Sequence, residues 1–191
     1  MKSIILKHIN EHISILNSFD EDMIKEISFI SSVFCNAIKK NKTIFWCGNG
    51  GSASDSQHLA AELIGRFDKN RRPFRSISLT ADSSVLTCIS NDFGFDNVFS
   101  RQVEGLSKSG DIIVGISTSG LSKNVINALK SAKQKNMTTV GFLGKGGGNQ
   151  KKYCDYSIVI DSLNTARIQE CHIMLGHIIC DLIERKLDLA Q

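Results

Sequence analysis

Hydrophobic residues recur with two different periods along the chain. In residues 2–17 the apolar positions are three or four apart (Ile5, Ile9, Ile13 and Leu16), which predicts one face of an α-helix. Ser18 and Glu21 have the spacing of a capping box at the start of a second helix. The stripe of that helix runs through Met23, Ile27, Ile30, Phe34, Ala37 and Ile38. Residues 1–40 are therefore predicted to form an N-terminal helical extension, with apolar surface typical of a subunit contact.

From residue 42 onward, short apolar runs alternate with helical stripes. Runs at 43–47, 75–79, 111–117, 138–143 and 157–160 predict strands, and helical patterns occupy 53–65, 83–90, 97–106, 123–136 and 165–187. This alternation predicts an α/β fold, a three-layer αβα sandwich around a parallel five-stranded sheet. Residues 41–191 are expected to form this α/β core, and the whole chain, 1–191, is expected to be one domain.

The composition is that of a globular protein, with 41% hydrophobic residues, 22% charged residues and a net charge of +4. One basic cluster, formed by Lys69, Arg71, Arg72 and Arg75, is interpreted as a solvated loop. Attraction to anionic sugar phosphates is a second interpretation. Nucleic-acid binding is disfavoured, because the cluster lacks the repeated aromatic residues of a stacking platform.

The six cysteines contain no C-x-x-C pair, and several lie on apolar stripes, which predicts reduced core thiols in a reducing compartment. The apolar run at the N-terminus is interrupted by Lys7 and His8 and is too short for a signal sequence. No later stretch is long enough to span a membrane. These features predict a cytoplasmic protein without membrane contact.

Ligands of a parallel sheet bind beyond the carboxyl ends of its strands, which directs attention to the loops after Cys47, Ile116 and Ile160, of which the first two are rich in candidate groups. The first loop consists of Gly48, Asn49, Gly50, Gly51 and Ser52. Glycines before a helix let backbone amides approach a ligand closely. A tight turn without a ligand explains these glycines equally well, and the loop matches neither a dinucleotide fingerprint nor a Walker A motif.

The second loop carries four hydroxyl groups, on Ser117, Thr118, Ser119 and Ser122. Hydroxyls and amides at the positive end of a helix form a phosphate cradle. Alternatively, Ser122 caps the following helix and the other hydroxyls face water. Capping leaves three hydroxyls without a role, so phosphate binding is the favoured interpretation. The glycine-rich segment 144–148 is interpreted as a mobile turn.

Two helices carry candidate acid, base and metal-binding groups. His58 and Glu62 are four positions apart, which places them on one helix face about 6 Å apart along the axis. Such a pair can share a metal ion, act on one substrate as acid and base, or be an ordinary surface pair. Gln169 and His177 are about 12 Å apart along the last helix and reach one ligand only if their side chains converge. His172 is interpreted as a packing residue.

In order and spacing, four stretches of the chain resemble the phosphoheptose isomerase family. They read CGNGGSASDSQHLAAELIGRF, SNDFGFDNVFSRQVEGL, GDIIVGISTSGLSKNVINA and ARIQECHIMLGH. The resemblance covers nearly the whole chain. The glycine and serine loops are shared by the wider sugar-isomerase superfamily, so the more specific marks are His58, Glu62, Gln169 and His177.

The resemblance implies a role for each matching residue. Glu62 would be the general base and His177 the opposing general acid. The family's zinc ligands match His58, Glu62, Gln169 and His177, with one Zn²⁺ per subunit. Sugar contacts are implied for Asn49, Gly50, Gly51, Ser52, Glu62, Asn91, Asp92 and Gln169, and phosphate contacts for Ser117, Thr118, Ser119 and Ser122. Ala166 stands where some members carry an acid, so a different rate or pH optimum is expected if that acid tunes the histidine.

The reaction implied is conversion of sedoheptulose 7-phosphate to D-glycero-D-manno-heptose 7-phosphate through an enediol, the first step toward ADP- or GDP-heptose precursors. It requires a base at carbon and an acid at oxygen, and zinc would polarise the carbonyl. The family also implies a homotetramer with active sites at subunit interfaces. The alternative is a non-catalytic relative that binds a protein partner such as a replication initiator, which would not need Glu62 and His177. A third possibility, a sugar-phosphate-sensing domain, normally accompanies a second module.

Overall fold

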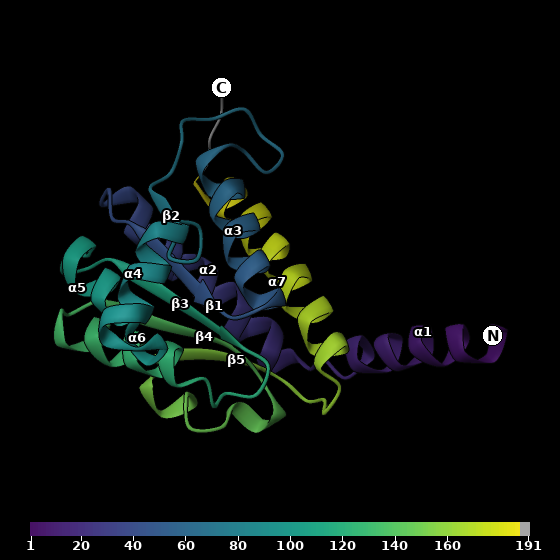
Figure 1. The fold of residues 1–191 in the computed structure, drawn as a ribbon. Helices are drawn as coiled ribbons and strands as arrows, with labels where there is room; N and C mark the ends of the chain where they lie inside the picture. The colour runs from purple at the N-terminus through teal and green to yellow at the C-terminus, as the bar shows by residue number, and fades with distance from the viewer. Residues whose placement is uncertain (188–191) are drawn as a thin grey trace.

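The computed structural model describes residues 1–187 (Figure 1). Its helices are α1 (Lys2–Asn17), α2 (Glu21–Lys39), α3 (Gly51–Ile64), α4 (Ser83–Phe93), α5 (Ser100–Leu106), α6 (Lys123–Gln134) and α7 (Thr165–Lys186). Its strands are β1 (Ile44–Gly48), β2 (Ser76–Ser78), β3 (Ile112–Ser117), β4 (Thr138–Gly144) and β5 (Tyr156–Ile160). Short 3-10 turns occupy η1 (Phe95–Asn97), η2 (Lys145–Gly147) and η3 (Lys151–Tyr153).

The five strands form one parallel sheet in the order β2-β1-β3-β4-β5. In the central strand β3 all six residues are buried, as expected for a strand covered on both faces. Side chains alternate along it, so that Val114 packs with the core that includes α2, α3 and α7, whereas Ile113 packs with α5 and α6. The predicted three-layer α/β sandwich is therefore confirmed.

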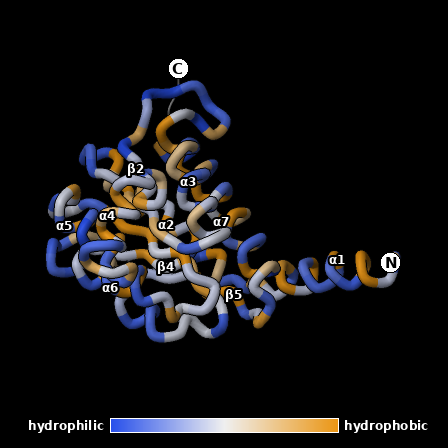
Figure 2. The backbone as a smooth tube through the Cα atoms, in the orientation of Figure 1, coloured by the Kyte–Doolittle hydropathy of each residue, from blue (hydrophilic) through white to orange (hydrophobic). Residues whose placement is uncertain are grey.

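Helix α1 projects away from the body of the molecule (Figure 1), and several of the hydrophobic residues that recur along it (Figure 2) are exposed to solvent. These are Ile4, Ile5, Leu6, Ile9 and Ile13. Near its middle the helix is tied to the start of α7, because Arg167 donates to the His8 carbonyl at 2.7 Å and Asn164 donates to Glu11. Within residues 1–187, none of the helices is both long and apolar enough to cross a membrane.

Several local expectations were wrong. Asp20, not Ser18, caps α2 by accepting from the Met23 amide, while the Ser18 hydroxyl donates to the Ile15 carbonyl. The predicted helix over 97–106 begins instead with the 3-10 turn η1 and continues as α5. Arg71, assigned to a solvated loop, is buried in an ion pair with Glu184. This last difference arises because its partner lies far away in the sequence.

The cysteines largely follow the prediction of free core thiols. All six are free, and Cys35, Cys47, Cys171 and Cys180 are buried. Burial raises the pKa of the Cys180 thiol to about 12, which keeps it protonated and unreactive at neutral pH. Cys88 is the exception to the core prediction, because it is exposed on α4.

Candidate active site

The glycine loop links the carboxyl end of β1 to the first turn of α3. Gly50 has φ +57°, a conformation that favours glycine, and the Ser52 amide closes the turn on the Asn49 carbonyl at 3.1 Å. Gly51 lies against another element, since a Cβ added to it would lie 2.5 Å from Nε2 of Gln169 on α7. The loop therefore exposes backbone at the strand end while keeping α7 close.

The serine loop follows β3, immediately beside the end of β1, because Ile116 pairs with Gly48 in the sheet. The Ser117 hydroxyl accepts from the Gly120 amide at 3.1 Å and lies 3.2 Å from the Ser122 hydroxyl. Ser122 is the residue before α6, but its side chain makes no capping bond, so the capping interpretation fails. Four hydroxyl-bearing residues and a helix N-terminus therefore converge at this strand end, as a phosphate cradle requires.

A pair of asparagines connects the two loops. Asn49 and Asn124 exchange two hydrogen bonds, each 2.9 Å long. Asn124 is buried in the first turn of α6, and its side-chain Oδ1 atom also accepts from the Val125 backbone amide. Asn124 was not among the predicted site residues. Its position two residues after Ser122 is the signal that would have suggested it.

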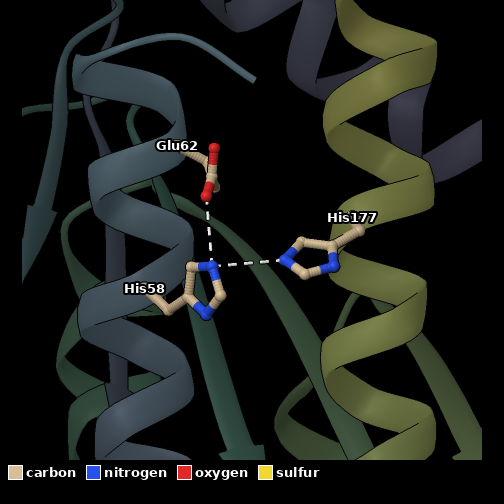
Figure 3. A group of neighbouring side chains, drawn as sticks. All are labelled: His58, Glu62 and His177. Carbon is tan, nitrogen blue, oxygen red and sulfur yellow. Dashed lines mark hydrogen bonds and ion pairs between the residues drawn. The ribbon is translucent and has the colours of Figure 1, made fainter. Parts of the chain in front are cut away.

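His58, Glu62 and His177 form a compact triad (Figure 3). His58 Nε2 lies 3.1 Å from Glu62 Oε1 and 3.3 Å from His177 Nε2. His58 and Glu62 project from successive turns of α3, whereas His177 comes from α7, more than a hundred residues later. Gly176 permits this approach, because a Cβ there would lie 2.5 Å from Leu59 Cδ2. The triad thus depends on close packing between α3 and α7.

Phe67 covers one side of the triad. Its ring centroid lies 5.5 Å from that of the His177 imidazole, at an interplanar angle of 38°. A cavity of about 520 Å³ beside α7 is lined by residues that include Phe67, Ile173, Met174, His177 and Leu182. The His177 ring therefore borders both the other two triad residues and a largely apolar surface.

Comparison with known proteins identifies the family. A family model described as SIS domain matches residues 7–144. The phosphoheptose isomerase of a Nitratiruptor species is 50% identical over 184 residues, which cover 94% of this chain and 98% of the relative. A solved phosphoheptose isomerase structure from Neisseria gonorrhoeae has a TM-score of 0.91 at 37% identity, covering 96% of this chain and 98% of that one. The chain belongs to the phosphoheptose isomerase family.

Further relatives agree with this assignment. Phosphoheptose isomerase 1 of Campylobacter jejuni subsp. jejuni serotype O:2 is 47% identical, over 96% of this chain and 98% of the relative. The predicted family resemblance and the assignment as an isomerase enzyme are therefore confirmed. The chain is therefore a sugar-phosphate isomerase.

In this member of the phosphoheptose isomerase family, the triad has a donor set that fits a zinc ion. Its three ligand atoms all lie within 4.8 Å of one another. With zinc–ligand bonds of about 2.0–2.1 Å, neighbouring donors of a tetrahedral site are about 3.3 Å apart. The two measured separations, 3.1 and 3.3 Å, are close to this value. One proton on His58 Nε2 serves two acceptors poorly, whereas a central cation satisfies all three groups.

The other predicted site residues lie at varying distances from the triad. Gln169 is two turns before His177 on α7, with its amide against Gly51, so the structure places it at the glycine loop. Asn91 and Asp92 lie on the exposed last turns of α4, where the Asn91 amide donates to Asp92 at 2.8 Å. Ala166 lies in the first turn of α7. Gln169 thus lies against the glycine loop, and none of these residues belongs to the triad.

Asp55 is a group that the sequence analysis did not consider. It lies one turn before His58 on α3, and its Oδ2 atom is buried without a hydrogen-bond partner in residues 1–187. Burial raises the pKa of this carboxyl to about 6, although nearby His58 opposes the rise. The Asp55 carboxyl, with a pKa of about 6, therefore lies beside the triad without belonging to it.

Proposed function

We propose that the protein interconverts sedoheptulose 7-phosphate and D-glycero-D-manno-heptose 7-phosphate. The observation that carries this proposal is the convergence of Glu62 and His177 on His58, in a chain 50% identical to a phosphoheptose isomerase. A protein that only binds a partner has no need for this acid–base pair. In this role the product would be the first intermediate of nucleotide-activated heptose synthesis.

In the proposed reaction, Glu62 removes a proton from C1 of the ketose while His177 gives a proton to the C2 oxygen, which forms the enediol. Glu62 then returns its proton to C2, and His177 takes the proton from the C1 hydroxyl, which leaves the aldehyde. Figure 3 shows one Glu62 oxygen directed at His58 and the other directed away from it. This second oxygen is the one that would act on carbon.

The serine loop would hold the phosphate through Ser117, Thr118, Ser119 and Ser122. The adjacent glycine loop, with Asn49, Gly50, Gly51 and Ser52, would contact the sugar, together with Asn91, Asp92 and Gln169. His58 lies seven residues after Gly51, roughly 10 Å along α3, a distance that an extended seven-carbon chain can bridge. Phosphate binding at one end would therefore orient the reacting carbons at the other.

Within this proposal, His58, Glu62 and His177 would hold a zinc ion, with Gln169 as the fourth ligand. Zinc bound there would polarise the substrate carbonyl. His58 would serve only to hold the metal and to orient the Glu62 carboxylate, which it contacts at 3.1 Å. The proton transfers would use the second Glu62 oxygen and the Nδ1 atom of His177, which are not the atoms that face the metal.

We also propose that the enzyme acts in the cytoplasm as a homotetramer with active sites at subunit interfaces. The exposed apolar stripe of α1 and the apolar surface beside His177 support this assembly. Sedimentation equilibrium would test it, since a monomer of 21.0 kDa and its tetramer are easily distinguished.

The isomerase proposal is tested by incubating the protein and zinc with sedoheptulose 7-phosphate in deuterated buffer. Proton NMR should show the aldose anomeric signal, with deuterium at C2 from exchange during the enediol step. Glu62→Gln should fold normally and bind phosphate but give no turnover, whereas the exposed control Glu21→Gln should retain activity. A folded, zinc-supplied wild-type protein without turnover would favour the partner-binding alternative, which a pull-down would then test.

A further inference from the structure

A buried ion pair lies close to the triad but contributes no group to it. Arg71 Nε donates to Glu184 Oε1 at 2.7 Å, and both side chains are only 1% exposed. Arg71 belongs to the loop between α3 and β2, whereas Glu184 lies near the end of α7. A charge pair removed so completely from water requires many further hydrogen bonds.

Glu184, on α7, accepts several of these further hydrogen bonds. Its two carboxylate oxygens accept from the backbone amides of Phe67, Asp68 and Lys69, at 2.8–3.0 Å, in addition to Arg71. Burial alone would raise the pKa of this carboxyl, but the hydrogen bonds from these amides and from Arg71 outweigh burial and lower it. Glu184 therefore fixes the backbone of the loop that carries Phe67.

Arg71 donates the other hydrogen bonds, to backbone carbonyls at the end of α3. Its Nη2 donates to the Glu62 carbonyl at 2.8 Å, and its Nη1 donates to the Leu63 carbonyl at 3.0 Å. Carbonyls in the last turn of a helix have no partner within the helix, and a cation there also interacts favourably with the negative end of the helix dipole. Arg71 thus holds the backbone of Glu62 itself.

The Arg71–Glu184 pair is also connected to His177, because Glu184 and His177 belong to the same helix, α7. His177 and Glu184 are seven residues apart, close to two full helical turns, so both face the same side of α7. That side packs against α3, as the 3.3 Å approach of His177 Nε2 to His58 Nε2 shows. Arg71 and Glu184 therefore connect the backbone of Glu62, the helix of His177 and the loop of Phe67.

We propose that the Arg71–Glu184 ion pair positions the catalytic groups. It sets the separation of Glu62 and His177 and holds Phe67 against the His177 ring. This inference rests on the proposed function, whose proton transfers require both groups to meet one substrate. Displacement of a catalytic group by about 1 Å can reduce a rate on the order of a hundredfold. Arginine is required because its planar fork bonds carboxylate and carbonyls together, which the lysine ammonium cannot do.

The test is Arg71→Lys, which keeps the charge but loses the fork. The kcat should fall ten- to a hundredfold, while the KM for the sugar phosphate changes less than threefold, because the serine loop lies elsewhere. The His177 ring signals in a heteronuclear NMR spectrum should also shift, whether or not substrate turns over. The matched control is Arg185→Lys, in an exposed pair with Asp181 on the same helix and with the same 2.7 Å contact.

Two results would overturn the proposal. One is an Arg71→Lys protein with lowered thermal stability but wild-type kcat and unmoved His177 signals, which would make the pair purely structural. A second variant, Phe67→Leu, leaves both charges in place and covers the case in which Arg71→Lys does not fold. Phe67→Leu should shift the His177 signals, and unmoved signals would refute the role of the loop. Absence of turnover in the wild type would refute the isomerase function alone, because the NMR comparison does not depend on it.

Discussion

Asn49 and Asn124 join the two ligand loops through a reciprocal pair of 2.9 Å hydrogen bonds. One asparagine belongs to the glycine loop after β1, and the other to the first turn of α6 after the serine loop. Each amide satisfies the donor and the acceptor of its partner, so this buried polar contact is balanced. The relationship sets the distance between the proposed sugar site and the proposed phosphate site.

Asn124→Ala should therefore weaken substrate binding without removing a catalytic group. The variant leaves the Asn49 amide and the Val125 amide without their partner, and we expect a loss of about 1–3 kcal/mol in the free energy of unfolding. The KM should rise about tenfold, with kcat changed less than threefold. Steady-state kinetics and urea unfolding measure these effects. Asn127→Ala is the control, because that side chain is only partly buried on the same helix and donates to the Asp96 carbonyl, away from both loops.

Ser119→Ala tests the location of the phosphate. Its hydroxyl accepts from the Leu121 amide at a relatively long 3.2 Å and is only partly buried, so it remains available to a ligand. Loss of this hydroxyl should mainly raise the KM, by about tenfold to a hundredfold, the effect of one hydrogen bond to a charged group. A KM equal to that of the wild type would place the phosphate elsewhere.

Most of the fold could be predicted because its signals are local. The continuous apolar run at β3 and the glycine that ends β1 mark the strand edge where ligands bind, and both loops were located on this basis. The spacing of His58 and Glu62 likewise placed them on one helix face. Their meeting with His177 could not follow from spacing, because it depends on the packing of α3 on α7 around Gly176.

Long-range polar contacts account for what was missed. Arg71 looked like one member of a solvated cluster, and its burial depends on Glu184, 113 residues later. The role of Asn124 could not be inferred from its neighbours in the sequence, because its partner Asn49 lies 75 residues earlier. A sequence shows that a residue is charged or polar, but only the fold shows whether it has a partner that makes burial possible.

His172 predicts a pH dependence of stability. It is fully buried, and burial lowers its pKa to about 4, although a hydrogen bond with the Leu143 carbonyl, 3.1 Å away, opposes this. The folded state thus binds a proton less readily than the unfolded state, so stability falls as the pH drops below 6.5. Over the range from pH 6.5 to about 4, this residue should account for a loss of roughly 3 kcal/mol.

The comparison is with His172→Gln, which keeps a donor for the Leu143 carbonyl but does not titrate. Urea unfolding across this pH range should show a shallower decline for the variant than for the wild type. His8→Gln, an exposed substitution on α1, should retain the wild-type slope. Parallel declines for all three proteins would show that His172 is not the group responsible.

The triad predicts zinc binding independently of turnover. His58 Nε2 lies within 3.3 Å of a donor atom on both Glu62 and His177, so its loss removes the central ligand. His58→Gln should lower zinc affinity on the order of a hundredfold, measured by competition with a chromogenic chelator, and His8→Gln should not change it. Zinc should also raise the melting temperature of the wild type, because it binds the folded state.

Gln169→Ala separates the fourth ligand from the other three. The Gln169 amide lies against Gly51, two helical turns from His177, so its loss should lower zinc affinity less than loss of His58 does. Equal losses would mean that Gln169 moves onto the metal as a full ligand. Retention of wild-type affinity in His58→Gln would instead refute the metal site, and the triad would then act only through its acid and its base.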